Sequence, residues 1–242
     1  MLKTKIISGV AVMAAFAAFI YTSEPVSAAG KKRSATFQVR IENISNPDGL
    51  SGLNGEKYPF AISPGVFYAN SKKDQFFQEG KKADAALEAQ AEDGNPDLLA
   101  KKLLTKVGSV FMGVFNKPVG SELAAPLLPG GAFEFSFTAE EGMRFNLITM
   151  FGQSNDLFYS SKQAIELFDD KGNPLTGDIT EQFQLWDAGT EKNQAPGIGD
   201  EQAPRQKMAN TGTAEQSVVG PVKDQFTYPN TKDVLRITIT AR

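Results

Sequence analysis

The sequence predicts a mainly β protein, an antiparallel β-sandwich with a short helical insert and a long loop before the last strand. Three observations support this fold class. Short segments with alternating apolar and polar residues recur along the chain, clusters of turn-forming residues separate them, and helical spacing is confined to residues 81–104. Many short strands joined by turns are typical of antiparallel sheets that pack face to face.

The first strand is predicted over residues 36–44. Phe37, Val39 and Ile41 alternate with polar residues there, which is the pattern of a half-buried strand. Residues 45–57 are rich in Asn, Asp, Gly and Ser and therefore predict a loop. Residues 58–68 mix aromatic residues with two prolines and a glycine, so we expect a broken extended segment.

One or two short helices are predicted between residues 81 and 104. The first contains Leu87 and ends at Gly94, because glycine commonly stops a helix. The second is expected to have Asn95 as its N-cap and Pro96 at its first helical position. It is expected to carry an apolar stripe of four leucines: Leu98, Leu99, Leu103 and Leu104.

The second half of the chain reads almost entirely as strands and loops. Residues 116–131 hold three prolines and predict a loop. Residues 133–137 and 143–149 alternate on either side of a turn at 139–142, so we expect a hairpin with its phenylalanines in the core. Further strands are expected over 164–168, 179–186 and 234–240, with a turn at 169–174. The loop from Asp187 to about residue 229 is long, and long loops are often functional.

Residues 1–29 are typical of a signal peptide. Lys3 and Lys5 precede an apolar run over residues 6–21, and small residues follow at 26–29, so cleavage is expected after Ala28 or Ala29. We therefore expect an exported protein, secreted or periplasmic, whose domain covers residues 30–242. The apolar run is short for a membrane span, and no later segment is apolar enough, so no integral membrane segment is expected after cleavage.

Composition narrows the possible chemistry. The chain has no cysteine and no histidine, which removes thiolate nucleophiles, imidazole bases and the usual zinc sites. Its net charge of −3 argues against a nucleic-acid partner, which would require a basic face.

Two acidic loops are the strongest candidates for a site. Asp156 follows one β-patterned segment, and Asp187 and Glu191 follow another, separated by a sequence whose Gly189 permits a tight turn. Loops at adjacent strand ends can lie side by side, so these three carboxylates can converge on calcium, a hard cation that takes oxygen ligands. Acidic residues are also common in ordinary turns, and the spacing alone leaves both readings open.

Five segments together resemble the spondin N-terminal domain, the domain of F-spondin and mindin, and suggest a bacterial-type single-domain secreted member. They occur in the family's order and cover nearly all of the chain after residue 30. The segment around Trp186 is the most specific. The matching segments are Phe37–Asn43, Ile62–Val66, Leu87–Gly94, Ser154–Phe158 and Leu185–Glu191.

The resemblance implies a C2-like β-sandwich that binds calcium and acts in cell adhesion or in the extracellular matrix, without enzymatic activity. It implies Asp156, Asp187 and Glu191 as the calcium ligands, with Glu191 at a position where Asp is common. It also includes Glu92-Asp93-Gly94, where Asp93 is more readily explained as a helix end than as a ligand. The implied partner is an extracellular or cell-surface protein or polysaccharide.

Two other functions remain open at this point. The protein can be a structural envelope component in which calcium only stabilises the fold. It can also be a glycoside hydrolase that uses Asp156 and Asp187 as its carboxylate pair, although no long aromatic run suggests a sugar cleft.

Overall fold

The computed structural model describes residues 32–52, 55–71, 76–105 and 110–242, and residues 32–242 form one compact unit. The predicted signal peptide, residues 1–29, lies outside the described residues. Within the described ranges, none of the helices has the length and apolar character needed to cross a membrane.

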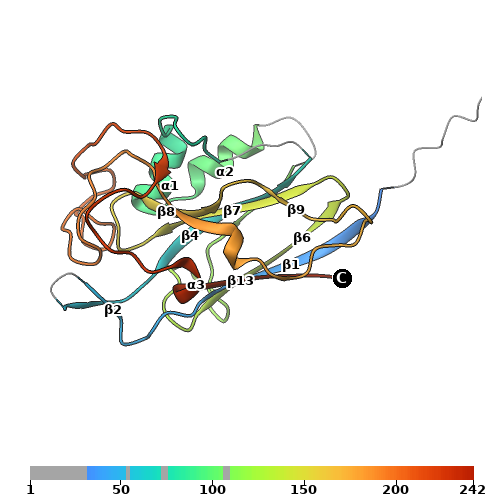
Figure 1. The fold of residues 1–242 in the computed structure, drawn as a ribbon, viewed down its shortest axis with the longest axis horizontal. Coiled ribbons are helices and arrows are strands. Elements are labelled where there is room, and N and C mark those ends of the chain that lie inside the picture. Colours follow the sequence, from blue (N-terminus) through green and yellow to red (C-terminus); the bar gives the residue numbers. More distant parts are fainter. Residues whose placement is uncertain (1–31, 53–54, 72–75, 106–109) are drawn as a thin grey trace, which may run out of the picture. The chain divides into compact units, whose positions relative to one another are not determined.

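The chain is mainly β, with antiparallel sheets, as the sequence predicts (Figure 1). The smaller main sheet has the order β10 (Gly177–Asp178), β13 (Leu235–Ala241), β1 (Ser34–Asn43) and β6 (Ala132–Glu140). The larger has the order β12 (Gly220–Pro221), β11 (Phe183–Asp187), β8 (Leu157–Ser161), β7 (Arg144–Phe151), β4 (Ile62–Asn70) and β5 (Val110–Phe115), with β9 (Ile165–Glu166) also paired to β7. The strands β2 (Leu50–Ser51) and β3 (Lys57–Tyr58) form a separate pair.

Among the described residues, four short helical elements accompany the sheets. They are α1 (Ala85–Asp93), α2 (Asp97–Leu104), the 3-10 turn η1 (Thr180–Gln182) and α3 (Thr231–Val234). The helices α1 and α2 lie beside the larger sheet, and the long loop between β11 and β13 passes close to α1 (Figure 1).

The predicted hairpin over residues 133–149 is wrong in its pairing. The strand β6 pairs with β1, whereas β7 pairs with β4 and β8, so the two strands belong to different sheets. Their phenylalanines meet across the core instead, with the rings of Phe137 and Phe145 stacked at 5.4 Å between centroids. Alternation shows that each strand has one apolar face but does not reveal whether two such faces lie side by side or opposite each other.

Several element boundaries also differ from the predictions. The strands β5 and β8 were not predicted, and the strand expected over 164–168 shrinks to β9. The segment expected as a strand over 179–186 begins with η1. The strand β8 is buried along its whole length, so it lacks the polar alternation that identifies a half-exposed strand.

The second helix begins later than predicted and buries fewer leucines. Pro96 occupies its N-cap position, although the Asn95 Oδ1 still accepts a hydrogen bond from the Asp97 N–H at 3.0 Å. Leu99 and Leu103 are buried, whereas Leu98 and Leu104 are exposed. The predicted stripe of four leucines therefore divides into a buried pair and a solvent-facing pair.

Gly94 ends α1 as predicted and also allows close packing on the sheet. Its φ of 62° is left-handed, and a Cβ there would lie 2.4 Å from the Ser63 Cβ. Gly80 has a similar φ of +79° but open space around its Cα. The pair therefore separates backbone strain from steric overlap.

We expect Gly94→Ala to lower the free energy of unfolding by about 2 kcal/mol or more, because strain and overlap add, and Gly80→Ala by only about 1 kcal/mol. Urea unfolding of both variants measures the difference. Equal losses of free energy of unfolding in the two variants would show that β4, which contains Ser63, shifts to make room for the new Cβ without an energetic cost.

Candidate metal centre

The two predicted acidic loops lie at the same end of the larger sheet. In the antiparallel pair of β8 and β11, Asp187 is opposite Leu157, the residue that follows Asp156. The Ala188 N–H also donates to the Asp156 backbone carbonyl at 3.2 Å. Strand pairing thus brings Asp156 and Asp187 together although thirty-one positions separate them in the sequence.

Asp156 is completely buried, with 0% of its surface exposed. Its Oδ2 accepts hydrogen bonds from the Thr190 N–H at 2.7 Å, the Thr190 hydroxyl at 3.1 Å and the Glu191 N–H at 3.0 Å. Its Oδ1 has no hydrogen-bond partner. Burial, reinforced by the negative charge of Asp187, raises the pKa of Asp156 to about 7.

The carboxylate of Asp187 accepts hydrogen bonds from residues of the turn that follows β11. Its Oδ1 accepts from the Gly189 N–H and its Oδ2 from the Asn193 side-chain amide, both at 2.7 Å. Burial raises its pKa as well, against the effect of these two donors. Gly189 has a φ of +68°, and a Cβ there would lie 2.8 Å from the Val218 backbone nitrogen, so this turn requires glycine.

Glu191 enters the same buried region, with 3% of its surface exposed. Its Oε1 accepts from the Gly212 N–H at 2.7 Å, while its Oε2 has no partner. Burial raises the pKa of Glu191 to about 7, and the charge of Asp156 acts in the same direction.

A fourth carboxylate, in addition to the three predicted ligands, comes from α1. Glu92 is only 2% exposed, its Oε2 has no partner, and burial together with the charge of Glu191 raises its pKa to about 7. Its neighbour Asp93 instead accepts hydrogen bonds from the Gln206 amide at 2.8 Å and the Asn210 N–H at 3.2 Å. In the structure, therefore, Asp93 anchors the long loop, and Glu92 is the buried acid.

Helical periodicity does not indicate that Glu92 is buried. It follows Leu87 by five residues and therefore lies about 140° around the helix from that buried leucine. Thr190, from the loop after β11, lies beside the Glu92 carboxylate, and Gln206 from the same loop contacts the neighbouring Asp93. The only sequence signal was its place in the Glu92-Asp93-Gly94 segment.

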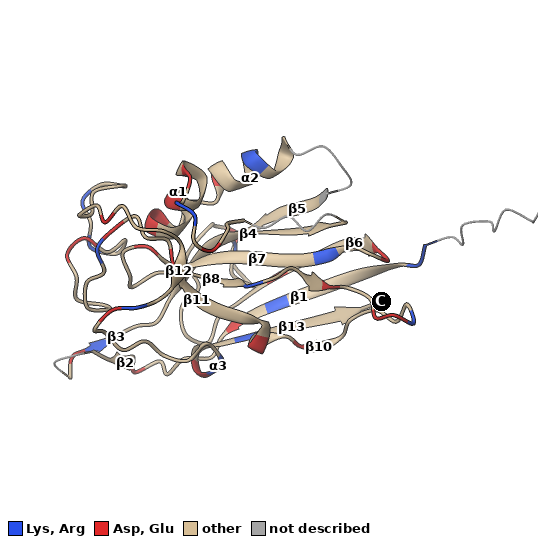
Figure 2. Ribbon diagram, turned by 45° about the horizontal axis from the view of Figure 1, so that its top comes forward, with Lys and Arg blue, Asp and Glu red and all other residues tan. Residues whose placement is uncertain are grey.

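These four side chains form what we call the acidic cluster: Glu92, Asp156, Asp187 and Glu191. Figure 2 shows acidic positions, in red, on α1 and on the loops beside it. Among the described residues, no lysine or arginine forms a salt bridge with any of the four. In addition, one buried carboxylate oxygen on each of Glu92, Asp156 and Glu191 has no hydrogen-bond partner. Unpaired buried carboxylates are costly, and a hard cation would satisfy them.

The cluster is not arranged as a ready metal cage. Within the ranges that the structure describes, no three acidic side chains stand close enough together to hold a metal ion. Asp187 in particular directs both of its oxygens to Gly189 and Asn193. Ligation by Asp156, Asp187 and Glu191 remains a prediction, and it requires the Asp187 carboxylate to turn towards the other two.

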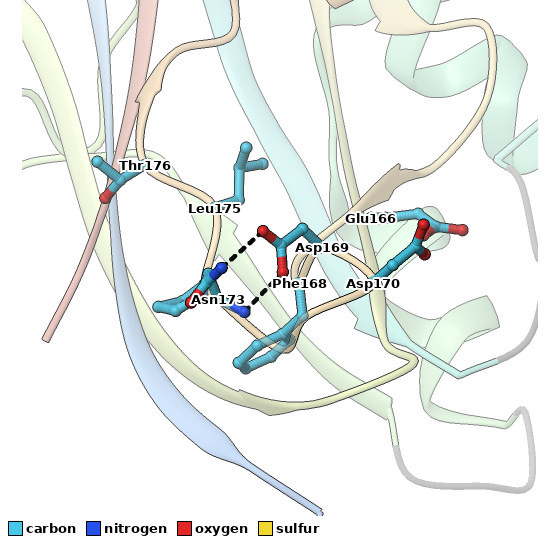
Figure 3. A pocket seen from close by; sticks show the side chains of 8 residues that line it. Glu166, Phe168, Asp169, Asp170, Asn173, Leu175 and Thr176 are labelled. Atoms are coloured by element: carbon cyan, nitrogen blue, oxygen red, sulfur yellow. Dashed lines mark hydrogen bonds between the residues drawn. The ribbon is translucent and has the colours of Figure 1, made fainter.

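A second acidic segment, Asp169–Asp170, is accounted for by the turn it forms. The Asp169 Oδ1 accepts from the N–H groups of Lys171 and Asn173, and its Oδ2 accepts from the Asn173 side chain at 2.8 Å (Figure 3). These donors hold the pKa of Asp169 below its ordinary value, with Asn173 contributing most. Asp169 lines an open surface pocket, and its carboxylate has the polar partners that the acidic cluster lacks.

The fold and the site together define an antiparallel β-sandwich with a buried acidic cluster at one end of its larger sheet. No protein-family model matches the chain, and no curated protein matches it. The resemblance to the spondin N-terminal domain thus rests on the sequence segments given above and stays a prediction.

Proposed function

We propose that the protein is an exported, non-enzymatic binding module of the spondin type that uses calcium to organise a contact surface for adhesion. One observation carries the proposal: Asp156 and Glu191 are buried acids with unpartnered oxygens and no basic partner among the described residues. Their oxygen-only chemistry suits calcium better than softer metals.

The contact surface in this proposal is the long loop after Glu191. Hydrogen bonds to acidic side chains hold this loop at several points. Glu191 accepts from the backbone of Gly212, and Asp93 from Gln206 and Asn210. Glu201 accepts from the Thr213 hydroxyl at 2.9 Å. A cation at the base of the loop would fix these anchors relative to the sheet and present the loop to a surface protein or polysaccharide.

The geometry suits the two alternative functions, a glycoside hydrolase and a structural envelope protein, to different degrees. Complete burial of Asp156, with three donors on its Oδ2, leaves little room for a sugar and weighs against a glycoside hydrolase. The same burial favours a cation that only stabilises the fold, so the structural function is the main competitor.

A binding experiment tests the proposal. Labelled protein is applied to a glycan array and to immobilised cell-envelope proteins, in calcium and in chelator. The loop variant is Met208→Glu, and the control is Leu123→Glu, because both residues are exposed and only Met208 belongs to the long loop. We expect binding that requires calcium, falls at least tenfold in Met208→Glu and survives in Leu123→Glu.

Two results would contradict this expectation. If calcium stabilises the protein but no surface material binds, the structural function is correct. If binding is the same in calcium and chelator, calcium does not organise the contact surface.

A further inference from the structure

We propose that two copies of the protein associate through β5, which forms the outer strand of the larger sheet. This inference goes beyond the proposed function and does not depend on the calcium site. Within the described ranges β5 pairs only with β4, and no loop residue adds a backbone hydrogen bond to its other side. The outward N–H and C=O groups of β5 are therefore available to a further strand.

The other outer strands of the two main sheets carry features that discourage such pairing, and β5 does not. The strands β10 and β12 contain only two residues each, and β12 includes Pro221, which has no N–H to donate. The strand β6 is long but carries Glu134 and Glu140. In contrast, the six residues of β5 include no charged residue and no proline. An edge strand of this kind pairs readily with another strand.

The side chains of β5 are complementary to those of β5 in a second copy. Two copies related by a two-fold axis at Gly113 pair in the antiparallel direction. On the face that the register with β4 directs towards the main core, Phe111 then lies opposite Phe115 of the second copy. On the face directed towards the helices, Met112 lies opposite Val114 of the second copy. Apolar residues therefore meet on both faces of the joined sheet, and no like charges oppose each other.

The apolar side chains at this edge are more exposed than the side chains of a paired strand. Phe111 is 42% exposed and Val114 is 37% exposed. Both residues would be covered by the second copy in the register described above. The second copy thus accounts for an apolar surface that the described part of a single chain leaves open to solvent.

The helix α2 presents a leucine on the same side of the molecule. Its Lys102 forms a salt bridge with Asp84, the N-cap of α1, so this flank of α2 faces α1. Leu104 lies about 160° around the helix from Lys102, on the opposite flank, and is 72% exposed. Because α1 contacts β7 and β8 whereas α2 contacts β5, the Leu104 flank faces the open edge of the sheet (Figure 2). In the two-fold dimer, the two α2 helices run antiparallel with their Leu104 flanks towards each other.

Sedimentation velocity over a range of protein concentrations tests the inference. The variants are Val114→Lys and Leu104→Lys, because a lysine at a sheet edge opposes pairing with another strand. The control is Val218→Lys, which changes an exposed valine next to β12, at the opposite edge of the larger sheet. We expect a mass of two chains for the wild type and for Val218→Lys. The dissociation constant of the dimer should rise at least tenfold in the other two variants, and circular dichroism verifies that each is folded.

Hydrogen exchange locates the interface in the wild type without any substitution. We expect backbone amides of residues 110–115 to exchange more slowly at high protein concentration than at low concentration. A wild type that has the mass of one chain at all concentrations overturns the inference. An unchanged dissociation constant in folded Val114→Lys and Leu104→Lys also overturns it, because association then uses another surface. An assembly larger than two chains has the same meaning, since pairing through β5 occupies the edge of both copies and stops at two.

Discussion

Calcium should raise the unfolding temperature of the protein by several degrees. A ligand at about 100 times its dissociation constant adds about 2.7 kcal/mol to the free energy of unfolding. For a domain of this size, each kilocalorie corresponds to roughly 2–4 °C, so the expected shift is about 5–10 °C. The physical reason is the relief of the buried, unpartnered oxygens of Asp156 and Glu191, which bound calcium would coordinate in the folded state.

Asp187→Asn should abolish most of this shift while preserving the turn. An asparagine oxygen can still accept from the Gly189 N–H, and the Asn193 Oδ1, which has no partner, is available to accept from the new amide. The matched control is Asp170→Asn, which removes one charge from an exposed turn. Differential scanning calorimetry in calcium and in chelator measures all three proteins. If the wild-type unfolding curves in millimolar calcium and in chelator overlap, calcium does not bind the acidic cluster, and its members are ordinary turn and core residues.

The fold class could be predicted from local patterns, but the pairing of strands could not. Phe133, Phe135 and Phe137 correctly identify a strand with one apolar face. The choice between a hairpin and a connection between sheets depends on contacts with β1 and β4, which are far away in the sequence. The same limit explains why β8 was missed, since a strand buried on both faces carries no alternation.

The candidate site shows a similar division. Asp156 and Asp187 could be placed together because each follows a strand and strand ends converge, and the structure does bring them together. Glu92 could not be found in this way, because it lies on a helix, and the loop residue beside it, Thr190, is distant in the sequence. Burial created by distant segments leaves no periodic signature in the helix itself. Motif position was therefore the only sequence guide to Glu92.

In chelator, we expect the free energy of unfolding to decrease as the pH rises from about 5 to 8. In the folded protein the pKa of Glu92 and of Glu191 is raised from 4.5 to about 7, and that of Asp156 from 3.8 to about 7. The folded state therefore binds more protons than the unfolded state between these values, and stability falls with pH in that window. A shift of two units at one group corresponds to about 2.7 kcal/mol.

Other acids act in a different pH range and do not obscure this effect. The pKa values of Glu42 and Asp178 are lowered, chiefly by Arg236 and by Thr180 respectively. Their contribution is present above their unfolded pKa values and is lost only as the pH falls below about 4. Chemical unfolding at pH 5, 6, 7 and 8 in chelator thus isolates the acidic cluster. Glu92→Gln should flatten the dependence, because it removes one of the acidic groups whose pKa is raised in the folded protein.

In the presence of calcium, the free energy of unfolding should instead increase as the pH rises from about 5 to 8. Binding requires ionised carboxylates, so calcium affinity increases as the cluster loses its protons, and the stabilisation by calcium should be small at pH 5 and large at pH 8. The curves in calcium and in chelator should therefore diverge as the pH rises, and the unfolding temperatures at each pH measure the divergence. A calcium effect of equal size at pH 5 and pH 8 would show that the cation binds away from Glu92, Asp156 and Glu191. Stability in chelator that increases towards pH 8 would show that these acids are ionised in the metal-free fold, with charge partners other than a cation.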